Sequence, residues 1–239
     1  MENKALRFIL CVGIGFALLP AAAWASGGSS LPPPSMPPSS GGNQLEPPPP
    51  RKSPAEEAVE HYNAGNQHRD KALGLLKEAS QAGTEKERGK LENKSRKEFE
   101  RATSEYRQAT QLNPNFYQAF SDLGFALRKT GDYTSALEAY NRALSLAAAY
   151  APAIEYRAEA YLGLDQVEDA KKAYLQLFPN DRSHADELLT AMKGWVEKRQ
   201  TDPGKLTPEM VQSFSTWVQE REDLAKQTPS VSELRTRKW

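Results

Sequence analysis

The stretch YQAFSDLGFALRKTGDYTSALEAYNRALSLAAAY, residues 117–150, decides the fold, because its key positions recur in the flanking sequence with a spacing of 34 residues. The residues that keep this spacing are Ala102, Ala136 and Ala170, and Tyr106, Tyr140 and Tyr174. Apolar residues at Phe99, Tyr133 and Val167 keep the same period. A fixed period of this length is typical of a stack of similar supersecondary units, so the sequence predicts a repeat protein.

The same stretch resembles a tetratricopeptide repeat. Its first half carries the pair Leu123 and Gly124, and its second half carries Ala136 and Tyr140. Two short antiparallel helices pack closely only where a small residue on one faces a large residue on the other, so we expect Gly124 to contact Tyr140. The resemblance implies an all-α fold, a tetratricopeptide-type solenoid of helical hairpins.

The resemblance extends over residues 55–180, in which units 117–150 and 151–180 follow a first hairpin that is longer. Gly65 matches the small position of a first helix and Pro114 closes the unit, but 25 residues too many separate them. The extra residues are charged and carry apolar residues at helical spacing, which favours two lengthened helices over a charged loop. The expected turn lies at residues 81–84, with Thr84 and Glu87 spaced as a capping box. Such a hairpin would project by roughly 18 Å.

Residues 181–228 predict a degenerate C-terminal helix pair. Leu188, Met192 and Trp195 follow Ile154, Ala158 and Tyr161 by 34 residues, and a second helix begins around Thr207 and Pro208. A solenoid leaves its last apolar face uncovered, so this pair should act as a cap. The alternative is that Trp195, Trp217 and other aromatic residues form a glycan-binding site.

The amino-terminal end of the chain indicates export. Lys4 and Arg7 precede an apolar run, and Ala23 to Ala25 offer small residues for cleavage, so residues 1–25 resemble a signal peptide. The run is shorter than a membrane span, which disfavours the alternative, an uncleaved anchor. Residues 26–54 are rich in Pro, Ser and Gly and predict a disordered linker, and residues 229–239 a flexible tail. We expect a periplasmic or secreted protein without membrane insertion after signal removal.

The composition and the motifs argue against catalysis and against metal or cofactor binding. Cys11 is the one cysteine and would leave with the signal peptide, so disulfides and thiolate metal sites are not expected. The 31 basic and 31 acidic residues give a formal net charge of zero, so the chain has no net positive charge that would attract nucleic acid. Phosphate-loop, nucleophile-elbow and zinc-protease motifs do not occur. We therefore expect neither enzymatic activity nor a cofactor nor a metal.

The resemblance implies a binding role, because first helices of such repeats line a concave groove. The positions that face the groove carry over to Asn66, Arg69, Gln118, Asp122, Phe125, Arg128, Lys129, Glu155, Tyr156 and Glu159. Phe125 and Tyr156 would be apolar anchors, Arg128 and Lys129 could hold a carboxylate, and the two glutamates would suit basic side chains.

One subfamily of these repeats clamps the C-terminal carboxylate of chaperones with lysine, asparagine and arginine. Only Asn66 agrees with that pattern here, whereas Tyr62, Asp122, Pro152 and Tyr156 stand at other clamp positions. Capture of a chaperone tail is therefore not expected. The leading hypothesis is an exported adaptor that binds a peptide or protein partner in the cell envelope. The alternative is a structural homodimer formed through the long first hairpin.

Overall fold

The computed structural model describes residues 52–228, all of which belong to one compact unit. The predicted signal peptide, all of the predicted linker before Lys52 and the predicted tail lie outside the described residues. Within residues 52–228 no helix is long and apolar enough to cross a membrane.

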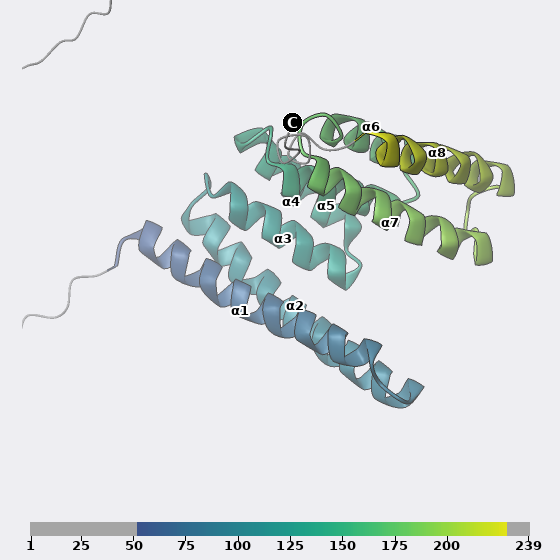
Figure 1. Ribbon diagram of the computed structural model, residues 1–239. Coiled ribbons are helices and arrows are strands. Elements are labelled where there is room, and N and C mark those ends of the chain that lie inside the picture. The colour runs from purple at the N-terminus through teal and green to yellow at the C-terminus, as the bar shows by residue number, and fades with distance from the viewer. Residues whose placement is uncertain (1–51, 229–239) are drawn as a thin grey trace, which may run out of the picture. The chain divides into compact units, whose positions relative to one another are not determined.

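Residues 52–228 form eight α-helices and no strand, which confirms the predicted all-α fold. The helices are α1 (Pro54–Ser80), α2 (Glu85–Leu112), α3 (Tyr117–Thr130), α4 (Tyr133–Leu146), α5 (Ala151–Gly163), α6 (Val167–Leu177), α7 (Arg182–Thr201) and α8 (Pro208–Gln227). Consecutive helices pack as hairpins, and each hairpin follows the previous one in chain order (Figure 1). The described residues are therefore a helical repeat solenoid.

Local signals set the helix ends. Ser53 caps α1 by accepting a hydrogen bond from the backbone N–H of Glu56, whose side chain accepts one from the N–H of Ser53 at 2.8 Å. The helix thus begins at Pro54, inside the predicted linker. Thr84 caps α2 by accepting from the N–H of Glu87 at 3.2 Å, which is one half of the predicted capping box.

The turn between α3 and α4 depends on a glycine. Gly131 has φ of 91°, a left-handed conformation that side chains other than glycine rarely adopt. The N–H of Asp132 reaches back to the carbonyl oxygen of Leu127 at 3.0 Å, and the Asp132 side chain then caps α4 by accepting from the N–H of Ser135. Two residues therefore suffice to reverse the chain.

A tyrosine in the second helix of each hairpin forms the centre of the core. Tyr106, Tyr140 and Tyr174 are each at most 1% exposed. A Cβ atom on Gly124 would lie 2.6 Å from the Tyr140 ring, and one on Gly65 would lie 2.5 Å from the Tyr106 ring. The expected contact between Gly124 and Tyr140 is therefore present, and the first hairpin repeats it.

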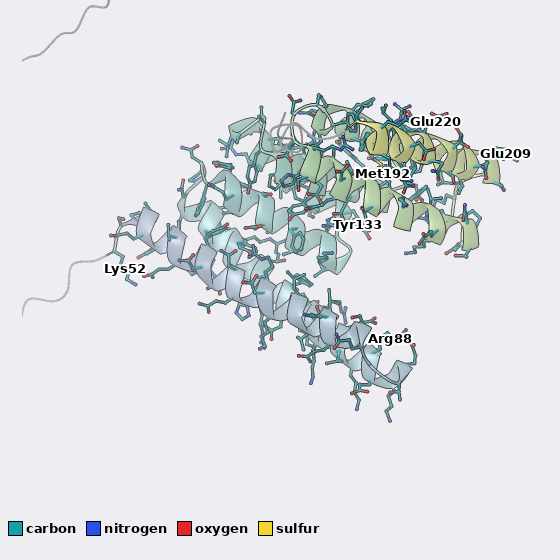
Figure 2. All side chains as sticks on the ribbon, viewed as in Figure 1. Lys52, Arg88, Tyr133, Met192, Glu209 and Glu220 are labelled. Atoms are coloured by element: carbon teal, nitrogen blue, oxygen red, sulfur yellow. The ribbon has the colours of Figure 1, made fainter. Side chains whose placement is uncertain are left out.

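The first hairpin is elongated, as predicted: α1 and α2 have 27 and 28 residues, whereas α3 and α4 have 14 each. Because Gly65 and Tyr106 meet as Gly124 and Tyr140 do, the 25 additional residues lie beyond the repeat, in residues 72–98. We call this segment the extension; it adds roughly 20 Å to each arm. Figure 1 shows the hairpin running past the end of α3, and Figure 2 shows Arg88 near its tip.

The predicted capping pair is formed by α7 and α8. Leu188, Met192 and Phe214 are at most 1% exposed in a core cluster that also contains Tyr174 and Ala158. Arg182 at the start of α7 donates to the carbonyl oxygens of Ala225 and Thr228, at 2.7 and 2.9 Å. These bonds join the end of α8 to the beginning of α7.

Candidate binding surface on the first helices

The ten predicted binding residues all lie on α1, α3 and α5, the first helices of the three repeat hairpins. We call the surface that they form the first-helix surface. Their interactions divide them into a group between α1 and α3 and a group between α3 and α5. Gln118, half-buried in the first turn of α3, takes part in neither.

Between α1 and α3, Asp122 is the acceptor that joins the two helices. It accepts a hydrogen bond from the Tyr62 hydroxyl at 2.8 Å and pairs with the Arg69 guanidinium at 3.4 Å. Burial raises the pKa of the Asp122 carboxyl, an effect that these two donors oppose. Asn66 accepts from the buried Tyr106 hydroxyl at 2.8 Å, so its amide oxygen bonds within the first hairpin, from α1 to α2.

Between α3 and α5 the structure places aromatic rings beside cations. The Phe125 and Tyr156 rings have centroids 5.1 Å apart. The Arg128 guanidinium lies 5.3 Å from the first centroid and 5.6 Å from the second, and Lys129 Nζ lies 5.3 Å from the Phe125 centroid. These distances are within the range of cation–π attraction. We call these four residues the aromatic–cation cluster.

Arg128 is not a free cation, contrary to the expected role as a holder of a ligand carboxylate. Its side chain is 8% exposed, and its guanidinium donates to the carboxylate of Glu159 on α5. The sequence assigned these two residues to ligand groups of opposite charge, but the structure bonds them to each other. Lys129, one residue further, is exposed.

Glu155 is the most unusual member of the surface, because it is a carboxylic acid only 3% exposed. Its Oε2 atom is buried and has no hydrogen-bond partner. Burial and the nearby carboxylates of Glu159 and Glu187 raise the pKa of Glu155 to about 8, although Arg128 opposes them. Glu187 lies on α7 and was missed, because groove positions were carried over only to the three repeat hairpins.

Residues 117–150 match the family model described as "Tetratricopeptide repeat". The chain therefore contains a tetratricopeptide repeat at these residues. Among solved structures it is similar to the first tetratricopeptide repeat domain of Spaghetti (RPAP3), bound to the HSP90 peptide SRMEEVD. The two share 22% sequence identity over 53% of this chain and 94% of that chain, with a TM-score of 0.36. No curated protein matches the chain.

The two tryptophans considered for glycan binding pack into the last pair of helices of this repeat protein. Trp195 Nε1 donates to the carbonyl oxygen of Leu162 at 2.7 Å. The Trp217 ring stacks on Phe214 with an interplanar angle of 7° and meets the Tyr174 ring edge-on. These contacts engage both indoles in the packing of the capping pair against α5 and α6, and they leave the first-helix surface as the better candidate for a binding site.

Proposed function

We propose that the protein is an exported adaptor that binds a peptide segment or a partner protein through the first-helix surface. The observation that carries the proposal is the aromatic–cation cluster, in which Phe125 and Tyr156 meet Arg128 and Lys129 across α3 and α5. Interaction hot spots favour aromatic residues and arginine. The match of residues 117–150 to a repeat that occurs in a peptide-binding domain supports the same role.

Export and assistance in the assembly of a cell-envelope complex are part of this proposal. They are supported by the charged and apolar pattern of residues 1–25 and by the Pro-rich composition of residues 26–54. The amino-terminal sequence of the protein recovered from cells tests the export step. A chain that begins at Ser26 is the expected result, whereas one that keeps residues 1–25 would indicate retention of an anchor.

A displayed peptide library selected on the protein tests the binding role. The best peptide is synthesised and titrated against Lys129→Glu, since Lys129 is exposed and its reversal spares the buried side chains of Phe125 and Arg128. We expect its affinity to change by at least about fivefold, because reversing a charge within an interface alters electrostatic complementarity. A gain would indicate a cationic peptide and a loss an anionic one.

The matched control is Lys172→Glu, which makes the same charge change at an exposed site on the second helix α6. Its peptide affinity should stay within about twofold of the wild type. If both variants bind the peptide equally well, the first-helix surface is not the binding site.

Self-association through the first hairpin is a second candidate, favoured by exposed apolar residues on α1. Val59 and Leu73 are 47% and 39% exposed. Two copies of the hairpin could cover these side chains by packing along α1. The native mass measured over a wide concentration range tests the candidate, and a monomer at every concentration would rule it out.

A further inference from the structure

The carboxylates at the α5 end of the first-helix surface exceed the cations available to them. Glu155 and Glu159 lie one turn apart on α5, and Glu187 approaches Glu155 from α7. We call these three residues the acidic site. Among the described residues, the guanidinium that faces them is that of Arg128, and it is already bonded to Glu159.

The state of Glu155 points to a missing partner. Buried polar atoms in proteins almost always have a hydrogen-bond partner, and a buried polar atom without one is costly. Glu155 Oε2 has no such partner, and the residue is only 3% exposed. A donor that carries a positive charge would satisfy both this oxygen and the charge balance of the acidic site.

We propose that the acidic site binds a lysine or arginine side chain of the peptide partner, with Glu155 as the acceptor that the guest cation completes. The inference rests on the proposed function, since it assigns the chemistry of the partner for the same surface. It reverses the chemistry of a carboxylate clamp: the recognised group is a cation and the protein supplies the carboxylates. The neighbouring rings of Tyr156 and Phe125, which already accommodate Arg128, suit the apolar stem and charge of such a guest.

Binding of a cation should release a proton from Glu155. In the free protein burial and the charges of Glu159 and Glu187 hold the pKa of Glu155 at about 8, against opposition from Arg128, and Lys129 on α3 also faces this group. The carboxyl is therefore mostly protonated at about pH 7. A guest cation favours the ionised form and lowers this pKa, so the affinity for the guest should rise with pH between about 6 and 8 and level off above.

The test uses Nα-acetyl-arginine amide as the probe and Nα-acetyl-citrulline amide, its uncharged analogue, as the control. Protein with ¹³C-labelled glutamate carboxyls is titrated with each, and the Glu155 signal is assigned by its absence in Glu155→Gln. At about pH 7 the arginine probe should move this signal to the ionised position. The citrulline probe should leave it unchanged. Movement by both probes, or by neither, would overturn the proposal.

Two variants extend the test. Glu155→Gln should weaken the arginine probe by about tenfold, since it removes a charge-assisted hydrogen bond, whereas Glu168→Gln at an exposed site on α6 should not. Lys129→Glu should raise the affinity for the arginine probe. Misfolding cannot produce such a gain. Unchanged affinity in both Glu155→Gln and Lys129→Glu would overturn the proposal.

The remaining outcomes separate this inference from the proposed function. If selected peptides bind at the first-helix surface but lack lysine and arginine, the adaptor role stands and the cation site falls. The affinity for the arginine probe could also rise only after Arg235, Arg237 and Lys238 are replaced by glutamine. That result would mean that the chain's own basic residues compete for the site, and it would overturn the proposal of an external guest.

Discussion

The first hairpin contains two halves that are built differently. In the half that matches the repeat, α2 buries Phe99, Ala102 and Tyr106 against a glycine of α1. In the extension, residues 72–98, the buried residues are Ala72, Ala79, Ser95 and Glu98. One half has large rings against small residues, and the other has small residues and polar groups.

The difference shows how a repeat can be lengthened without disturbing its neighbours. The aromatic contacts fix the spacing of α1 and α2 where they adjoin α3, so the register of the solenoid is set there. The extension then continues both helices and joins them through hydrogen bonds, such as that from Ser95 Oγ to the carbonyl oxygen of Ala72 at 2.9 Å. Tight packing is therefore required in the repeat half and not in the extension.

The largest expected effect comes from Gly65→Ala in the repeat half. The added Cβ would lie 2.5 Å from the Tyr106 ring, which is fully buried and cannot move aside without shifting α2. Overpacking of this kind costs roughly 1–3 kcal/mol of the free energy of unfolding, measured by urea denaturation. Gly124→Ala should cost a similar amount, because the Tyr140 ring lies 2.6 Å from its Cβ position. Unchanged stability in both variants would show that the hairpins can open to admit a methyl group.

A smaller loss of stability is expected from Glu98→Gln at the base of the extension. Glu98 on α2 accepts from Lys71 at 2.9 Å and from His68 at 2.7 Å, and these two bonds hold α1 to α2. It also accepts from Arg101 of its own helix at 2.8 Å. Loss of the charge should lower the free energy of unfolding by about 1–2 kcal/mol. Glu105→Gln is the control, because Glu105 pairs only with His61 among the described residues.

The contribution of Glu98 should also depend on pH. Hydrogen bonds from Lys71 and His68 lower the pKa of Glu98 from 4.5 to about 2. An acid with a lowered folded-state pKa stabilises above its unfolded pKa and loses that contribution as the pH falls toward the folded value. The difference in stability between wild type and Glu98→Gln should therefore shrink between pH 4.5 and pH 2. A constant difference over this window would contradict the assignment.

The fold was predictable because its determinants repeat. The spacing of Tyr106, Tyr140 and Tyr174 indicated the hairpins, and the excess between Gly65 and Pro114 indicated the extension. The start of α1 was placed one residue late, because Ser53 and Pro54 end a Pro-rich stretch and were read with it. A capping box is a local signal of four residues, which composition obscures.

The candidate surface was predictable in position and less so in chemistry. Periodicity places Arg128 and Glu159 on the same surface, but their bond joins two helices and depends on side-chain reach, which periodicity does not encode. The environment of Glu155 depends on Glu187 of α7, where the repeat pattern fades. The burial of Glu155 beside this degenerate repeat could therefore not be predicted from the sequence and was found only in the structure.

The smallest effect, and the one of opposite sign, is expected from Gly74→Ala in the extension. Gly74 is an exposed interior residue of α1, and a Cβ atom there would meet nothing within 4 Å. Alanine restricts the unfolded chain and favours helix, so the variant should gain about 0.5–1 kcal/mol of stability by urea denaturation. The same substitution in one helix would then destabilise at residue 65 and stabilise nine residues later. A loss at Gly74 would mean that the extension is covered in solution, as pairing of two hairpins along α1 would require, because an open surface gives the added methyl group nothing to displace.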